Sequence, residues 1–517
     1  MPNRLFIIEA PGKEHILNRI LFTIYKQRCE IIATRGHICG NPPTLSEGWI
    51  NDELSETAYC VKKDKMDVLQ KIRLAAGIAD EIYLATDDDH EGDVIARDVV
   101  SNALNASEIN KLFRVRLRAM TIDEVRRTLS EREPYYPDAN KGDARRIVDR
   151  LIGSLSSREG AIGRVQGSLL IELDSQCPVV GMATLSIPSL DGKSLFTSAL
   201  PVFAGEPIDF DELNDLCRAS TLSPGQSFLQ PLASTWNHSD ILINCSLATD
   251  ASPSSIAAIM QKLYEKGEMT YPRSSQRTLS PETLNRTQLI ARMQGTTFKA
   301  DIVRGIRKEV LSKGHEAPSI IQSDIPLNRK VDGLVDLETA VKILVARNQV
   351  ECGIPCKFTI PNAVSLDNLP EKLKSLNWHS KSVQGICLWH QMDDNKYQRW
   401  TMQQSILHFM QQTNLGRPST VIQHIEKFIS RELINNDFTF TEKGTLWLIN
   451  HKDIFHNKNI SNIIEQYLEA NNDSPDVMVR ALIEICGLDV SNSISLTSPN
   501  GNESQEYTDN EFSNSFN

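Results

Sequence analysis

Short apolar runs alternate with stretches of helical spacing along the first 135 residues. Such runs, bounded by turn residues, favour buried strands, and apolar residues every three or four positions favour helices. We expect strands at 5–9, 30–34, 81–86 and 111–120, and helices at 13–26, from the acidic turn 87–92 to about 105, and from the capping box Thr121 to Glu124 onward. Alternating strands and helices are typical of a parallel sheet covered by helices. The pattern predicts an α/β domain over residues 1–135.

The chain changes character after residue 135. Residues 136–177 and 396–450 are predicted to form one helical domain, and residues 178–246 and 348–395, with short apolar runs between Pro, Gly and Asp turns, to form a strand-rich domain. A helical domain at 247–347 would interrupt the strand-rich one. We expect a helical extension at 451–488 and a disordered acidic tail at 489–517, which is rich in Ser and Asn and has no basic residue.

Composition narrows the class of protein. Hydrophobic residues make up 40% of the 517 residues, which is enough for several cores. No apolar run approaches the ~20 residues that cross a bilayer. The ten cysteines are scattered, without the spacing of a disulfide framework or a zinc site, which favours reduced thiols. We therefore expect a cytoplasmic protein without membrane association.

Charge must be considered locally. The net charge of -11 argues against a protein that simply coats nucleic acid, but residues 111–164 hold thirteen Lys or Arg against eight Asp or Glu. This basic segment is a candidate phosphate-binding surface. A solvated amphipathic surface is the alternative interpretation.

Carboxylates gather where predicted strands end. Asp87, Asp89 and Glu91 follow an apolar strand at alternate positions, and Glu9 ends the first strand. Ligands of open α/β sheets collect at such ends, and carboxylate oxygens suit Mg²⁺. Lys13 would offset the repulsion and approach a phosphate. A plain solvated acidic loop is the alternative.

These segments carry a family resemblance. Glu9-Ala-Pro-Gly-Lys13 together with Asp87-Asp-Asp-His-Glu-Gly92 resembles the Toprim fold of topoisomerases, primases and some nucleases. The segment from Leu263 through Tyr271 to Arg273 resembles the nucleophile segment of type IA DNA topoisomerases. Further similar segments follow in that family's order: Gly36-His37, Arg114 to Thr121, Ala144 to Arg150, Gly163 to Gln166, His315 to Ala317, and Gly416 to Thr420. The resemblance covers about residues 4 to 445.

The resemblance implies a fold of α/β plus α and β class: a multidomain torus with an N-terminal Toprim domain, helical domains and a strand-rich arch. It implies that Tyr271 is the nucleophile, with Arg273 and Lys13 stabilising negative charge and Glu9 acting as general acid. Glu9, Asp87, Asp89 and Glu91 would hold Mg²⁺. The implied DNA-binding residues are His37, Arg118, Thr121, Arg126, Arg145, Arg146, Gly163, Arg164, Gln166, His315 and Arg417.

The neighbouring tyrosines differ in context. Tyr264 lies at apolar spacing within a predicted helix and is expected in the core, whereas Tyr271 follows Gly267 and precedes Pro272, which places it in a loop. A phenol has an ordinary pKa of about 10 and needs cationic neighbours to act as a nucleophile.

The resemblance implies an ATP-independent topoisomerase that relaxes negatively supercoiled DNA through a 5′ phosphotyrosine. It would act as a monomer on single-stranded regions, and the sequence has no nucleotide-binding phosphate loop. The alternatives are a Toprim nuclease or primase and an inactive single-stranded DNA-binding torus. The sequence departs from the family at His90, where arginine is usual, at Asp93, where glutamate is common, and at Ala317-Pro-Ser. The zinc ribbons that follow in many relatives are not matched, so we expect low processivity.

Overall fold

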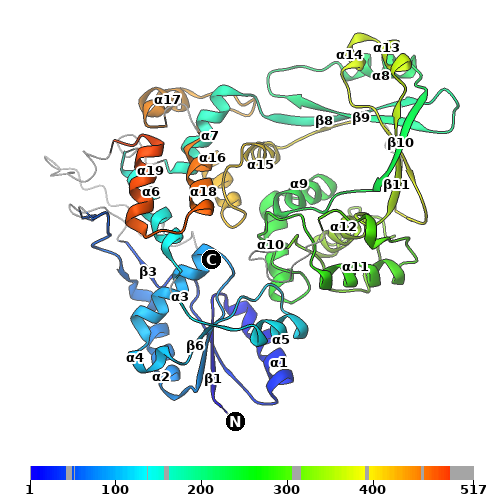
Figure 1. Ribbon diagram of the computed structural model, residues 1–517. Helices are drawn as coiled ribbons and strands as arrows, with labels where there is room; N and C mark the ends of the chain where they lie inside the picture. The colour runs from blue at the N-terminus through cyan, green and yellow to red at the C-terminus, as the bar shows by residue number, and fades with distance from the viewer. Residues whose placement is uncertain are drawn as a thin grey trace. The chain divides into compact units, whose positions relative to one another are not determined.

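The computed structural model describes residues 2–41, 49–51, 53–136, 138–155, 162–305, 316–389, 395–455 and 459–489 (Figure 1). The chain divides into two compact units. Unit 1 comprises Met1–Glu172, Glu265–Gly267 and Thr445–Asn517, and unit 2 comprises Leu173–Tyr264 and Glu268–Gly444.

Unit 1 contains a five-stranded sheet in the order β2-β1-β5-β6-β7. Its strands are β1 (Arg4–Ile8), β2 (Glu30–Ala33), β5 (Glu81–Leu84), β6 (Leu112–Arg114) and β7 (Glu133–Pro134). All neighbours pair in parallel except β6 and β7. The expected parallel sheet is present, but β6 is much shorter than the strand expected at 111–120. The strand ends at Arg114, whose side chain donates to the Leu84 and Thr86 carbonyls at the end of the neighbouring strand.

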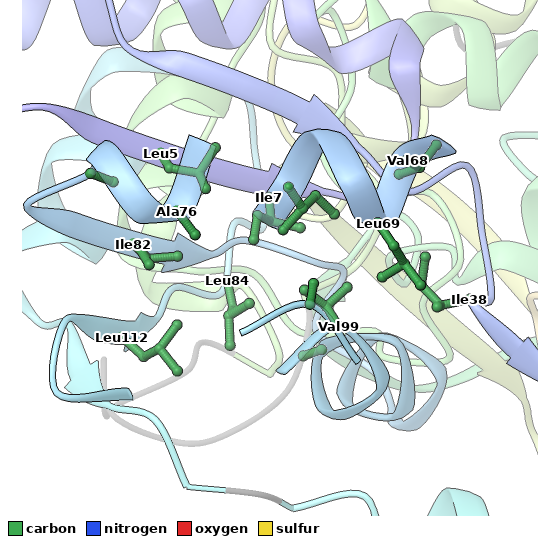
Figure 2. Packing of buried hydrophobic residues seen from close by; sticks show 14 of the residues in the cluster. Leu5, Ile7, Ile38, Val68, Leu69, Ala76, Ile82, Leu84, Val99 and Leu112 are labelled. Carbon is green, nitrogen blue, oxygen red and sulfur yellow. The ribbon is translucent and has the colours of Figure 1, made fainter. Parts of the chain in front are cut away.

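Helices cover both faces of this sheet, because side chains of a strand alternate between its faces. Leu5 and Ile7 of β1 pack with α2 (Met66–Ile78) and α3 (His90–Ala103), as Figure 2 shows. Phe6 and Ile8 pack on the opposite face with α1 (Glu14–Tyr25) and α5 (Ile122–Ser130). The central strands are thus buried on both sides, and their polar neighbours lie at the strand ends.

Helices from both ends of the sequence complete unit 1. Contacts join α6 (Asn140–Leu155) to α18 (Ile460–Ala470) and α19 (Pro475–Cys486). A Cβ on Gly167 of α7 (Arg164–Ser175) would lie 2.1 Å from the Phe455 ring of α17 (Glu442–Phe455), so this close approach requires glycine. The segment expected as an extension, 451–488, therefore contributes to the packing around α6 and α7. Smaller elements are β3 (Cys39–Gly40), β4 (Cys60–Val61) and α4 (Ala106–Ile109).

Unit 2 contains two antiparallel sheets. Both use the predicted strand-rich segment 178–246, but residues 396–399, which were predicted to belong to a helical domain, form a strand. One has the order β13-β8-β9, with β8 (Val179–Pro188), β9 (Leu195–Phe203) and β13 (Lys396–Arg399). The other has the order β10-β11-β12, with β10 (Pro224–Pro231), β11 (Pro355–Pro361) and β12 (Ser380–Val383). A core of Leu185, Phe196 and Trp378 joins the first sheet to α8 (Phe210–Arg218), α13 (Ala363–Asp367) and α14 (Glu371–Lys374).

The helices of unit 2 include α9 (His238–Thr249), α10 (Pro253–Glu265, whose last residue groups with unit 1), α11 (Pro281–Met293) and α12 (Leu337–Glu351). Two more, α15 (Met402–Gln412) and α16 (Val421–Ser430), follow β13. Helix α9 begins inside the segment expected to be strand-rich up to residue 246. Its apolar run resembles a strand, but Asn237 and Asp240 form a capping box that starts a helix.

Within the described ranges, no helix is long and apolar enough to span a membrane. All ten cysteines carry free thiols. The expected acidic tail, apart from Asp489, lies outside the described residues.

Candidate active site

The predicted acidic site lies at the carboxyl ends of β1 and β5. From β1 the chain moves outward to β2 and later returns to place β5 on the other side of β1, so the strand order reverses beside β1. The Arg35 N–H donates to the Glu9 carbonyl at 2.9 Å, and the Ala85 N–H donates to the Ile7 carbonyl at 2.8 Å. Glu9 and Asp87 therefore leave neighbouring strands at a topological switch point, where open α/β sheets bind ligands.

Lys13 and Asp87 form an ion pair at this edge. Lys13 ends a short 3₁₀ turn, Pro11–Lys13, and its side chain is buried. Asp89 has a different role, because its carboxylate accepts a hydrogen bond from the Gly92 N–H at 2.8 Å and caps α3. A Cβ on Gly92 would lie 2.2 Å from the Asp87 carbonyl oxygen, so only glycine permits this tight turn.

Arginines at the end of β6 and in the segment just after it hold the turn. The Arg114 guanidinium donates to the carbonyls of Thr86 and Asp87, both at 2.8 Å. Arg116 and Arg118 donate to the Asp88 carboxylate at 2.8 Å and 3.2 Å. Burial opposes the charge on Arg116, but the carboxylates of Asp93 and Asp88 outweigh it and raise the pKa of this guanidinium. The acidic turn is thus built into a network of cations.

His37 lies at the adjacent strand end. Its Nε2 is 2.9 Å from the carboxylate of Glu91, a residue in the first turn of α3. His90 is the first residue of that helix. The departure from the family at position 90 thus falls at the start of the helix that Asp89 caps.

Carboxylate oxygens are suitable ligands for a hard cation. In this structure, however, three of the four predicted ligands contact groups of the protein itself. Asp87 pairs with Lys13, Asp89 caps a helix, and Glu91 contacts His37. Among the residues that the structure describes, no three acidic, histidine or cysteine side chains form a ready metal site. The ligand set Glu9, Asp87, Asp89 and Glu91 stays a prediction.

The tyrosine loop, which we define as residues 270–277, follows α10 in unit 2. The Thr270 N–H donates to the Ser319 carbonyl and the Ser319 N–H donates to the Thr270 hydroxyl, both at 2.9 Å. The Tyr271 ring is 4% exposed and meets the Tyr264 ring edge-on, with 5.6 Å between centroids. Tyr264 is 1% exposed, which confirms that it belongs to the core. Arg273 is partly exposed on the same loop.

The predicted DNA-binding residues near the Toprim sheet have mixed surroundings. Arg118 pairs with Asp88, and the Thr121 hydroxyl accepts from the Glu124 N–H at 3.2 Å as the cap of α5. Arg126 is exposed and lies 3.3 Å from Asp123. Of these three, Arg126 has the open position expected of a residue that contacts a backbone phosphate.

The remaining predicted residues lie mostly on α6 and α7. Arg145 and Arg164 are buried and pair with Glu465 at 2.7 Å and 3.0 Å. Arg146 pairs with Glu56 at 2.6 Å. Gln166 is buried, Gly163 is exposed, and Arg417 is partly exposed. His315 lies outside the described residues. The structure thus gives Arg145 and Arg164 internal partners, and their contact with DNA stays a prediction.

Several residues around these sites were missed by sequence reasoning. Asp88 lies between Asp87 and Asp89, the alternate carboxylates that were predicted to bind metal. Its partners Arg116 and Arg118 follow a different strand, β6. His238 and Asp240 contact the tyrosine loop, and Arg277 is the last residue of that loop. The capping pattern Asn237 to Asp240 was the available signal for the start of α9.

The acidic strand ends lie in a segment that matches a known protein family. Residues 4–119 match the model of the Toprim domain family. DNA topoisomerase 1 of Campylobacter jejuni is 29% identical over 201 residues, which cover 37% of this chain and 28% of that protein. DNA topoisomerase 1 of Helicobacter pylori is 25% identical over 317 residues, which cover 54% of this chain and 42% of that protein. The chain thus spans less than half the length of these relatives.

A solved structure extends the likeness over nearly the whole chain. Full-length topoisomerase I from Thermotoga maritima superposes with a TM-score of 0.61 at 16% identity, covering 93% of this chain and 89% of that one. This likeness shows the fold, and it confirms the mixed fold class with a Toprim α/β domain.

Proposed function

We propose that this chain, which belongs with the bacterial-type type IA topoisomerases, cuts one DNA strand transiently, passes another strand through the break and reseals it. The observation that carries the proposal is the Lys13–Asp87 pair beside Glu9 at the switch point of a Toprim sheet. The same chain carries Tyr271 on a loop, with its ring packed against Tyr264. Negatively supercoiled DNA would supply the single-stranded region, and relaxation would need no ATP.

The chemistry is an in-line phosphoryl transfer. The Tyr271 phenol oxygen loses its proton to water and attacks the phosphorus. The bond from phosphorus to the 3′ sugar oxygen breaks, and Glu9 donates its proton to that oxygen. Arg273 and Lys13 stabilise the negative charge that grows on the phosphate oxygens. Because the 5′ phosphotyrosine keeps the energy of the broken ester, the free 3′ hydroxyl reseals the strand by the reverse path.

Magnesium is typical of Toprim domains, and we propose Glu9, Asp87, Asp89 and Glu91 as its ligands here. A bound Mg²⁺ would supply positive charge that positions the DNA backbone for rejoining. Carboxylates at neighbouring strand ends fit this role in chemical type. Lys13 already places one positive charge beside Asp87, so part of the charge compensation is supplied by the chain itself.

We propose that the DNA strand is held by residues of the predicted groove. These are His37, Arg118, Thr121, Arg126, Arg145, Arg146, Gly163, Arg164, Gln166, His315 and Arg417. We also propose that the chain acts as a monomer, without a nucleotide cofactor and in the cytoplasm. The ten free thiols support this location, because reducing compartments keep cysteines unpaired.

A Tyr271→Phe variant tests the proposal. We expect it to bind single-stranded oligonucleotide normally but to lose plasmid relaxation and the covalent adduct by on the order of 10⁴-fold or more. Tyr264→Phe is the matched control, because it removes the same oxygen from the neighbouring buried ring. Relaxation by Tyr271→Phe at the wild-type rate would exclude Tyr271 as nucleophile.

Denaturing the wild-type reaction in Mg²⁺ separates the alternatives. A topoisomerase leaves labelled DNA attached to protein, a Toprim nuclease leaves only free fragments, and an inactive single-stranded DNA-binding protein leaves the oligonucleotide intact.

A further inference from the structure

The first turn of α9 contacts four residues of the tyrosine loop, although this part of the sequence was predicted to be strand-rich. We propose that this turn sets the position of Tyr271 and that His238 is the positioning residue at its centre. The proposal rests on the proposed function, because it concerns how the nucleophile is presented.

His238 makes two hydrogen bonds to the loop, on either side of Arg273. Its backbone N–H donates to the Ser274 carbonyl at 2.9 Å, and its ring Nδ1 lies 2.8 Å from the Pro272 carbonyl oxygen. A carbonyl can only accept, so Nδ1 must carry the proton. The side chain is 3% exposed, and Nε2 is buried without a hydrogen-bond partner in the described part of the chain. The contact therefore fixes one tautomer of a buried imidazole.

The flanking residues of the turn hold the rest of the loop. The Asn237 side chain donates to the Ser275 carbonyl at 3.4 Å, and Arg277 donates to the Asp240 carboxylate at 2.8 Å. Asp240 also accepts from the Asn237 N–H at 2.9 Å, which closes the capping box. Asn237 and Asp240 thus both cap α9 and hydrogen-bond to the tyrosine loop.

Tyr271 lies between two fixed neighbours. Thr270 is bonded to Ser319 on one side, and Pro272 is bonded to His238 on the other. Proline also restricts its own φ, so the backbone around the phenol has little freedom left. Removing the His238 bond frees the C-terminal side of Tyr271. Because a displacement of about 1 Å in a reacting group can cost roughly 10²-fold in rate, this bond bears directly on catalysis.

The test compares His238→Phe, which fills the space without a donor, with His238→Asn, whose amide can place a donor where Nδ1 lies. We expect His238→Phe to slow adduct formation in a single turnover by about 10- to 100-fold, with unchanged affinity for the oligonucleotide. His238→Asn should restore the rate to within about threefold of wild type, since its donor meets the same carbonyl.

His451→Phe is the matched control. His451 is also buried and its Nδ1 lies 2.9 Å from a backbone carbonyl, that of Trp447, but it belongs to α17 in unit 1. This variant should lower the melting temperature without slowing adduct formation. A merely structural role of His238 predicts the same result for His238→Phe, and a folded His238→Phe protein with the wild-type cleavage rate would overturn the proposal.

Hydrogen exchange provides a readout that does not need activity. Amides of residues 270–277 should exchange faster in His238→Phe than in wild type or His238→Asn. If the wild-type protein forms no adduct, the proposed function fails, and the exchange comparison still decides whether His238 fixes the loop. Equal exchange in all three proteins contradicts the inference.

Discussion

The acidic strand ends of unit 1 and the tyrosine loop of unit 2 are held by different forces. At the strand ends, charged side chains meet charged side chains, as in Lys13 with Asp87 and Arg116 with Asp88. Next to Tyr271 in the loop, a neutral donor meets a backbone carbonyl, as in His238 with Pro272, and the charged pair of Arg277 with Asp240 lies at the far end of the loop. The first arrangement depends on the state of charge of each partner. The second depends on geometry and on a histidine that stays neutral.

The comparison is tested most strongly at Lys13. We expect Lys13→Met to slow cleavage by roughly 10²- to 10³-fold, because it removes positive charge from the site where phosphate charge grows. The measurement is adduct formation in a single turnover. Lys65→Met is the control, since Lys65 is also buried but donates to the Arg35 carbonyl at 2.7 Å. Equal rates for wild type and Lys13→Met would show that this charge is not used.

Acid should affect the loop through His238. Burial, aided by the charge of Arg273 and only partly opposed by the Pro272 hydrogen bond, lowers the pKa of His238 to about 4. Its ordinary value is near 6.5, so the unfolded chain binds the proton more readily. Stability from this group is complete above about pH 6.5 and falls as pH drops toward 4, by about 3 kcal/mol in all.

Urea unfolding at pH 7 and pH 4.5 measures this effect. His238→Asn should lose less stability between these pH values than wild type. Parallel losses in the two proteins would mean that His238 is not the titrating group.

Variants of Asp89 can distinguish its role as a helix cap from its proposed role as a Mg²⁺ ligand. Asparagine caps helices as well as aspartate does, so Asp89→Asn should keep the melting temperature while raising the Mg²⁺ concentration needed for relaxation. Asp89→Ala should raise the Mg²⁺ requirement in the same way, but it should also lose about 1 kcal/mol of stability and melt at a lower temperature. A Mg²⁺ titration of relaxation, combined with thermal melts, checks each part. An unchanged Mg²⁺ requirement in Asp89→Asn would remove Asp89 from the ligand set.

The smallest effect is expected at Thr121. Thr121→Ser keeps the hydroxyl that caps α5, while Thr121→Ala should cost about 1 kcal/mol. If the Thr121 hydroxyl also contacts DNA, Thr121→Ala should bind oligonucleotide more weakly than Thr121→Ser does. Equal binding by the alanine and serine variants would leave the residue with capping alone.

Local patterns predicted the local structure well. The strands that contain Ile7 and Leu84 are buried on both faces, which produces a continuous apolar run, and polar residues then mark the strand end. Glu9 and Asp87 could therefore be placed at strand ends from the amino-acid pattern alone. The apolar run inside α9 was assigned to a strand-rich segment, because Ile241 to Ile243 is apolar enough for a strand and only the capping box before it indicates a helix.

Partners that are distant in sequence could not be predicted. The family resemblance implied that Arg145 and Arg164 bind DNA, but both guanidinium groups pair with Glu465, about 300 positions later in the sequence. His238 carries no motif at all, because its acceptor is a main-chain carbonyl that every residue possesses. The sequence shows which side chains could form ion pairs or hydrogen bonds. It does not show which distant segments the fold brings into contact.

The late arrival of Glu465 has a consequence during synthesis. Glu465, the partner of Arg145, is synthesised 320 residues later. Helix α19, which covers a surface of α6, is synthesised later still. At about 5 to 20 residues per second, translation leaves this surface uncovered for roughly 15 to 60 s. The nascent N-terminal half therefore emerges from the ribosome with an apolar helix face exposed, the kind of surface that chaperones hold.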